Sequence, residues 1–229
     1  MSKKYELTNE TKTLADGTVL HRIRALMEPR FGVEAGELGG FVEGENNLSQ
    51  DGDAWVSGDA KVYGKAWVSG NAEISGNANV SGDAKVYGKA WVSGNACVSG
   101  DAKVSGNAEV YGKAWVSGNA RVYGDAEVYG DAKVYGNARV SGNAEIYGNA
   151  KVSANSDYMV IKNTWSSGRW FTYTRSNKKW AVGCFYGTGE ELVAKAYKDS
   201  KLSGKCYEAI VHAVETIEAA KAEAKGETK

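Results

Sequence analysis

The chain has 229 residues, which is long enough for one or two domains with a sizeable core. Its 28 Lys and Arg residues balance 28 Asp and Glu residues, and this balance argues against a protein that coats or mimics DNA. Glycine occurs 29 times and proline once, which excludes collagen and proline-rich disorder.

Residues 1–51 are expected to form an N-terminal β cap and the lead-in to a repeat. Tyr5–Thr8 and Thr11–Leu14 alternate polar and apolar residues and can pair with Thr18–Ala25 around a turn at Asp16 and Gly17. The start of the chain shows no apolar signal segment, and no apolar run approaches ~18 residues. These features predict a cytoplasmic protein that does not engage a membrane.

Residues 52–153 consist of consecutive hexapeptides without interruption. Each hexapeptide reads Gly, then Asn, Asp or Lys, then Ala, a variable residue, Val or Ile, and Ser or Tyr. The Ala and the aliphatic residue face one side of a short strand and the variable residue faces the other. Gly followed by Asn or Asp is a turn signal. Because one hexapeptide cannot bury its own Val, the units must stack into a solenoid.

This pattern resembles the hexapeptide-repeat family, whose fold is the left-handed parallel β-helix. The resemblance covers residues 52–153 and extends toward Val42–Ser49, where Val42 and Leu48 keep the spacing. It implies three hexapeptides per triangular coil, about six coils and assembly as a homotrimer. The fold class predicted here is therefore mainly β, a β-helix with an N-terminal β cap and a small α+β C-terminal module.

Three hexapeptides per coil would stack variable residues that are 18 positions apart into three faces. Face A then carries acidic residues, and face B is mixed. Face C carries a column of cations, which we call the basic ladder and which consists of Lys85, Lys103, Arg121 and Arg139. Sorted charges indicate that face C meets something negative, that face C docks on face A of another subunit, or that the pattern arose by chance, because charge patterning is a weak signal.

A second period of 24 residues runs through the repeat, since VYGKAWVSGNA begins at Val62, Val86 and Val110. This period is not a whole number of coils, so successive Trp residues are expected on different faces. Tyr111, Tyr129 and Tyr147 are expected to stack beside the acidic residues of face A, chiefly for structural support.

Residues 154–229 are expected to form a small antiparallel sheet with two helices. Strands are predicted at Tyr158–Lys162, Trp170–Arg175 and Trp180–Tyr186, with a turn at 176–178. A Thr188 and Glu191 capping box begins a helix that ends near Lys198, and a second helix spans about 204–223. Aromatic and basic residues gather here, and they serve either a binding surface or the core. The candidate contact residues are Trp165, Arg169, Trp170, Arg175, Lys178 and Lys179.

Catalytic residues are scarce. Acyltransferases of the hexapeptide-repeat family usually use a His base and its carbonic anhydrases bind a metal through several His ligands, whereas this chain has only His21 and His212, both outside the repeat. Cys97, Cys184 and Cys206 lack metal-ligand spacing. We therefore expect no enzyme, no metal and no cofactor.

The chain also resembles repeat proteins of bacterial viruses and prophages. The resemblance lies in the opening YELTNETKTLADGTVLHRIRAL, the segment AGELGGFVE, the GNA-type hexapeptides and the terminal WSSGRWFTYTRSNKKWAVGCFYGTGEEL. It implies an origin in a bacterial virus or prophage, and together with the basic ladder it suggests an accessory protein that interferes with host processes such as defence.

Taken together, these features predict a non-enzymatic, oligomeric binding scaffold. The expected partner is a host protein or a small anionic ligand, for which a nucleotide is one candidate, rather than nucleic acid. Two alternatives stay open: a structural protein that self-assembles or belongs to a virion, and an acyltransferase without its usual His.

Overall fold

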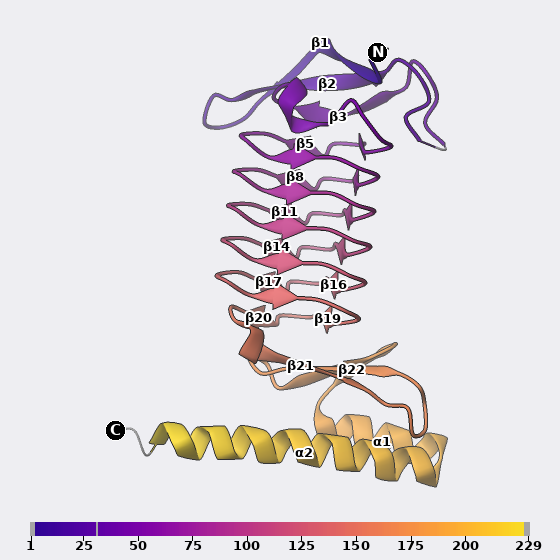
Figure 1. The fold of residues 1–229 in the computed structure, drawn as a ribbon, viewed down its shortest axis with the longest axis vertical. Coiled ribbons are helices and arrows are strands. Elements are labelled where there is room, and N and C mark those ends of the chain that lie inside the picture. Colours follow the sequence, from indigo (N-terminus) through magenta and orange to yellow (C-terminus); the bar gives the residue numbers. More distant parts are fainter. Residues whose placement is uncertain (1–2, 31, 227–229) are drawn as a thin grey trace. The chain divides into compact units, whose positions relative to one another are not determined.

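The computed structural model describes residues 3–30 and 32–226 and divides the chain into two compact units, residues 1–158 and 159–229. The first unit holds an antiparallel β cap followed by stacked parallel coils, and the second holds an antiparallel sheet and the helices α1 and α2 (Figure 1). The predicted fold class, a mainly β parallel solenoid of about six coils with these two additions, is confirmed.

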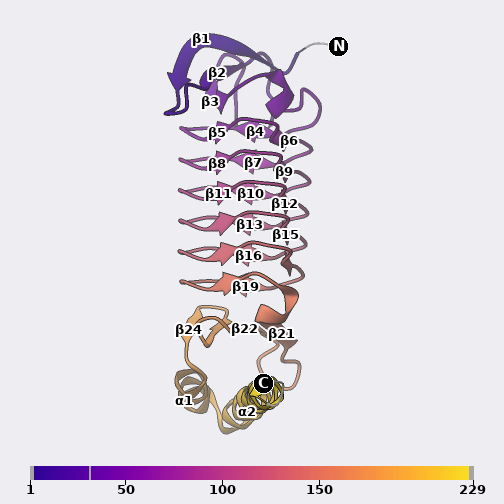
Figure 2. The ribbon, with the colours of Figure 1, turned by 90° about the vertical axis from the view of Figure 1, so that its left-hand side faces the viewer.

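The hexapeptides build the three predicted faces from two-residue strands (Figure 2). Face A consists of β4 (Trp55–Val56), β7 (Glu73–Ile74), β10 (Trp91–Val92), β13 (Glu109–Val110), β16 (Glu127–Val128) and β19 (Glu145–Ile146). Face B consists of β5 (Lys61–Val62), β8 (Asn79–Val80), β11 (Cys97–Val98), β14 (Trp115–Val116), β17 (Lys133–Val134) and β20 (Lys151–Val152). Face C consists of β6 (Trp67–Val68), β9 (Lys85–Val86), β12 (Lys103–Val104), β15 (Arg121–Val122) and β18 (Arg139–Val140).

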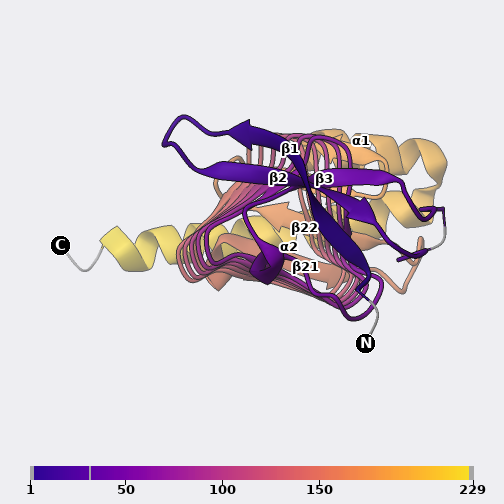
Figure 3. The same cartoon turned by 90° about the horizontal axis from the view of Figure 1, so that it is seen from above.

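Each coil hydrogen-bonds to the next through the main chain, in a register of 18 residues. The amide of Trp91 donates to the carbonyl of Ala108 over 2.9 Å, and Lys103 pairs with Arg121 in the same way on face C. The Ala and aliphatic side chains of the hexapeptides are fully buried and form the core. Seen from above, the coils lie nearly over one another (Figure 3), so the variable residues form straight columns.

The N-terminal cap is an antiparallel sheet that continues face B. It consists of β1 (Tyr5–Thr13), β2 (Val19–Ala25) and β3 (Leu38–Val42), and β3 pairs in parallel with β5. The sequence predicted two short strands before the turn. The structure has one strand, because a register shift between Leu7 and Thr11 lets β1 pair with β2 along its length.

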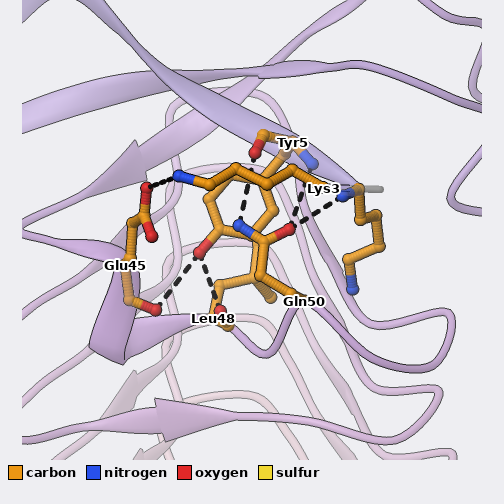
Figure 4. A network of polar contacts seen from close by, with 6 residues as sticks. Lys3, Tyr5, Glu45, Leu48 and Gln50 are labelled. Carbon is orange, nitrogen blue, oxygen red and sulfur yellow. Dashed lines mark hydrogen bonds and ion pairs between the residues drawn. The ribbon is translucent and has the colours of Figure 1, made fainter. Parts of the chain in front are cut away.

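A polar network attaches β1 to the lead-in segment (Figure 4). The hydroxyl of Tyr5 donates to the carbonyl of Leu48 over 2.7 Å, next to the short 3-10 helix Glu45–Asn47. The side-chain amide of Gln50 accepts from the backbone amide of Tyr5 and donates to its carbonyl. Gln50 therefore takes the place of a strand neighbour at this edge.

Lys4 closes the same end of the β-helix. Its side chain is buried, and its ammonium group donates to the carbonyls of Gly52 and Ala54, at 3.1 and 2.8 Å. Burial lowers the pKa of Lys4 to about 8, which Asp53 and Asp51 partly oppose. A cation thus satisfies carbonyl groups that have no further coil to bond to.

The last coil ends in a second 3-10 helix, Asn155–Asp157. One carboxylate oxygen of Asp157 accepts from the backbone amides of Ser153 and Ala154, at 2.7 and 3.0 Å. The hydroxyl of Tyr158 donates to the carbonyl of Arg139 over 2.8 Å. Side chains therefore also satisfy backbone groups at the C-terminal end of the β-helix.

The second unit is a sheet of β21 (Tyr158–Lys162), β22 (Trp170–Thr174), β23 (Lys179–Val182) and β24 (Phe185–Gly187), with α1 (Gly189–Asp199) and α2 (Lys201–Gly226). The single strand expected at Trp180–Tyr186 is wrong, because Gly183 adopts a φ of +55° and turns the chain between β23 and β24. The capping box at Thr188 is confirmed. Helix α2 begins three residues earlier than expected. Residues 227–229 lie outside the described residues.

Candidate functional site

The basic ladder lies in one column on face C, as predicted. Lys85 pairs in register with Lys103, which pairs with Arg121, and Arg121 pairs with Arg139. Neighbouring rungs of a sheet are ~4.8 Å apart. Trp67, whose side chain is 45% exposed, precedes Lys85 in the same column.

No ion pair within 4.0 Å joins a ladder cation to a carboxylate among the residues that the structure describes. Lys85, Arg121 and Arg139 are exposed and Lys103 is half-buried. Like charges directly opposite each other on a sheet are destabilising. The ladder therefore costs the isolated chain stability, and an external anion would offset that cost.

Two hollows flank the ladder, and both include Lys103 and Arg121. One, of about 570 Å³, is lined at the corner by Lys65, Asp83, Asp101 and Asn119 as well as ladder cations. The other, of about 280 Å³, lies on the opposite side of the column. The cations thus have room on both sides to point toward a ligand group.

Aromatic side chains line the smaller hollow. Tyr87 and Tyr123 are 41% and 40% exposed and lie on either side of Ser105 in the column next to the ladder. Phenol hydroxyl groups donate hydrogen bonds to anions, and the rings add apolar contact area. Sequence reasoning missed this contribution, although the alternation of Ser and Tyr at the sixth position of each hexapeptide was a visible signal.

Face A carries the opposite charge. Glu109, Glu127 and Glu145 pair in register and form what we call the acidic ladder. Partial burial, together with the charge of Glu127, raises the pKa values of Glu109 and Glu145. The carboxylates of this column therefore destabilise one another's charged forms in the isolated chain.

The predicted tyrosine stack beside the acidic ladder is confirmed. The ring centroids of Tyr111 and Tyr129 are 4.8 Å apart and those of Tyr129 and Tyr147 are 4.3 Å apart. Tyr111 donates to a carboxylate oxygen of Glu127 over 3.1 Å. Burial and the neighbouring carboxylates raise the pKa values of Tyr111 and Tyr129, so both phenols stay neutral donors.

Face B is mixed. The ammonium group of Lys133 lies 5.5 Å from the centre of the Trp115 ring, within cation–π range. Burial raises the pKa of the Cys97 thiol, which disfavours a reactive thiolate. As expected from the 24-residue period, Trp67, Trp91 and Trp115 lie on different faces and form no common platform.

Only some of the candidate contact residues of the second unit are exposed to solvent. Trp165 is 67% exposed, and Arg169 is exposed in the same loop. The loop is ordered by Asn163, which is fully buried and accepts from the amides of residues 165 and 166. Lys162 lies 4.7 Å from the centre of the half-buried Trp170 ring.

The remaining basic residues of this unit differ in how far their charges are engaged within the chain. Arg175 forms a two-point ion pair with Glu218, at 2.6 and 2.8 Å, so its guanidinium is engaged within the chain. Lys179 lies 3.8 Å from the carboxylate of Glu191. Lys178 is exposed in the turn before β23. Of these residues, Arg175 has its charge most fully engaged by a carboxylate of its own chain.

The two histidines lie outside the coils, one in the β cap and one on α2. His21 lies 3.3 Å from the carbonyl of Thr8 in the β cap. His212 is exposed on α2 and lines a groove of about 820 Å³ with Glu208 and Glu215. Among the described residues, no three His, Cys, Asp or Glu side chains gather as a metal ion would require.

Comparison with known families agrees with this geometry. Residues 114–130 and 132–144 match the family described as the YdcK beta solenoid repeat. Both matches lie inside the coils, and they support a β-helix repeat protein. The chain matches no curated protein. No helix in the described part of the chain has the length and apolar character needed to cross a bilayer.

Proposed function

We propose that this β-helix is a non-enzymatic, oligomeric binding scaffold and that face C is the surface that binds an anionic partner. The observation that carries the proposal is the basic ladder: four cations in register, none paired with a carboxylate in the described residues. A bound carboxylate or phosphate would accept charge-assisted hydrogen bonds from the ladder and from Tyr87 and Tyr123.

The form of the surface favours an acidic protein partner over a small ligand. The four cations are divided between two hollows, neither of which includes all of them, whereas a small-ligand site is a single concavity that encloses most of its ligand. The coils hold the cations on a rigid frame, because main-chain hydrogen bonds join every neighbouring pair of rungs. Rigid charges lose little conformational entropy when they bind. A small anion such as a nucleotide is the competing occupant.

The wider setting of the proposal is a cytoplasmic accessory protein of phage or prophage type that acts on a host protein, with interference in host defence as one result. This part depends on sequence resemblance. His21 lies in the β cap and His212 on α2, and this placement of both histidines outside the coils supports a role without catalysis. The cap over the first coil disfavours growth into filaments through solenoid ends, which is the structural alternative.

A binding titration with defined anions tests the proposal. The probes are a fluorescent peptide of eight glutamates and, separately, ATP. We compare the parent protein with the variant Lys85→Gln, Lys103→Gln, Arg121→Gln, Arg139→Gln. The matched control on face B is Lys61→Gln, Lys133→Gln, Lys151→Gln.

At concentrations low enough that the chain is monomeric, the peptide is expected to bind the parent and the control alike. It should bind the face C variant at least about tenfold more weakly, because each exposed charge contact is worth up to about 1 kcal/mol. Tighter binding of ATP than of the peptide would favour a nucleotide as occupant. Equal loss in both variants would show non-specific attraction and refute the assignment to face C.

A further inference from the structure

We propose that the anionic surface that covers face C is face A of a second copy of this chain. This inference rests on the proposed function, since it names the partner of the same basic ladder. It follows from three properties of the two ladders: their repeat distance, their register and their opposite charge.

The repeat distance of the basic ladder selects its partner. Rungs recur every ~4.8 Å on a rigid frame. An extended peptide places side chains on one face only every ~6.6–6.8 Å, so it matches only some of the rungs and engages the ladder less fully than a partner with the rung spacing. A partner that engages every rung must repeat at the rung spacing. The acidic ladder of this same chain does so, because its carboxylates stack in the same kind of register.

The register of the two ladders also matches. Each of three cations precedes a glutamate by six residues, which is one hexapeptide and rises only about a third of a coil, ~1.6 Å. A second copy rotated about an axis parallel to the stack, without translation, therefore sets cation opposite carboxylate at three successive coils. The pairs are Lys103 with Glu109, Arg121 with Glu127 and Arg139 with Glu145.

One coil earlier, the same rotation sets Lys85 opposite Trp91. The Trp91 side chain is 40% exposed, and Lys–Trp contacts are favourable cation–π pairs. The complementarity between face C and face A thus extends over four consecutive coils, coil by coil, and does not depend on a single ion pair.

Other pairings of faces are poorer. Face A against face A would oppose like charges at the four glutamate rungs, and face C against face C would do so at the four rungs of the basic ladder. Face B offers the acidic ladder only Lys133 and Lys151 on the corresponding coils, and Lys133 is already stacked over Trp115. Opposing cations would also stabilise the charged forms of Glu109 and Glu145, whose pKa values are raised in the isolated chain.

The contact is heterologous, because two different faces meet. A heterologous contact repeated by pure rotation closes into a ring, whereas one that includes translation along the axis grows into a filament. Since the ladders match without translation, the expected assembly is a closed ring with a mass that is a small multiple of 24.4 kDa.

Charge reversal on one face and then on both tests the contact. The face A variant is Glu109→Lys, Glu127→Lys, Glu145→Lys, and the face C variant is Lys103→Glu, Arg121→Glu, Arg139→Glu. Each reverses one side and should raise the concentration at half-dissociation about 100-fold or more, since like charges across an interface cost several kcal/mol. The variant that carries all six reversals restores opposite charges and should reassemble. Native mass spectrometry and sedimentation velocity measure the assembly.

The matched control is Lys133→Glu, Lys151→Glu on face B, which should leave the assembly intact. Circular dichroism confirms that each variant is folded. The inference would be overturned if the face B control dissociated, or if the variant with all six charge reversals were folded but failed to reassemble. A parent protein that is monomeric at high concentration would overturn it as well.

The outcome for face C as a binding surface is read separately. The variant Glu109→Gln, Glu127→Gln, Glu145→Gln leaves the basic ladder intact and uncovers it. If the parent proves monomeric and this variant binds the glutamate peptide, the proposed function is retained and only the second copy is removed as its partner. Absence of peptide binding to it would reject the proposed function itself.

Discussion

Alanine substitutions at two corner glycines separate two reasons for glycine in the coil: the left-handed backbone angle and the close approach of the next coil. Gly106 and Gly142 both adopt left-handed backbone angles, with φ of +73° and +66°. An L-residue at such an angle costs roughly 1–2 kcal/mol. They differ in space, because a Cβ on Gly106 would lie 2.9 Å from the amide nitrogen of Gly124, whereas a Cβ on Gly142 would meet nothing within 4 Å.

The magnitude for Gly106→Ala follows from what must move. Backbone atoms of the next coil cannot rotate away as a side chain can, so the coils must separate locally. The hydrogen bond from the amide of Asn107 to the carbonyl of Gly124, 2.8 Å long, would lengthen. The loss of one such bond adds about 1 kcal/mol, and strain in its neighbours adds more. We expect a destabilisation of about 3 kcal/mol for Gly106→Ala against about 1 kcal/mol for Gly142→Ala.

Thermal and denaturant unfolding of the two variants, followed by circular dichroism, measures the difference. The folded baseline of each variant should match the parent, and the midpoint of Gly106→Ala should lie clearly below that of Gly142→Ala. Equal midpoints would show that backbone conformation alone decides the glycine positions. The close approach of successive coils would then carry no energetic weight, and the reasoning above would be refuted.

Two further predictions concern charge. Burial and Glu127 raise the pKa of Glu145 above its ordinary value of 4.5, so its charge lowers stability above that pH and not below it. In the face C glutamine variant, Glu145→Gln should therefore raise the thermal midpoint at pH 7, and a gain that persists at pH 4 would contradict this. Arg175→Ala and Glu218→Ala should each destabilise residues 159–229 by about 1 kcal/mol. A double variant whose loss equals the sum of the two single losses would show that the ion pair contributes nothing.

The coils could be predicted from the sequence because each of their constraints is local. Gly, Ala and Val recur at fixed places within six residues. Gly allows the left-handed corner, Ala supplies a small inward side chain, and Val supplies an aliphatic side chain for the core. Register then follows from the count of three hexapeptides per coil. The columns on faces A, B and C were predicted correctly for the same reason.

The ends of the β-helix were less predictable because their contacts join distant residues. Nothing in the sequence marks Lys4 as a buried donor to carbonyls about fifty positions away, or Gln50 as a substitute for a strand neighbour. The ion pair between Arg175 and Glu218 likewise spans 43 positions. The turn at Gly183 was missed because the apolar residues on both sides of it read as one strand.

The mismatch between the 24-residue sequence period and the 18-residue coil has a consequence for changes in chain length. Loss of three hexapeptides would return every later side chain to its own face. Loss of only one, for example residues 94–99, would move Glu109 on to face C and Lys103 on to face B. Only the first deletion would keep the four cations of the basic ladder in one column, because after the second, Lys85 would stay on face C while the other three cations moved to face B. The number of hexapeptides therefore determines which face each later side chain occupies. Natural or designed variants that keep the charged faces should differ in length by whole coils of 18 residues.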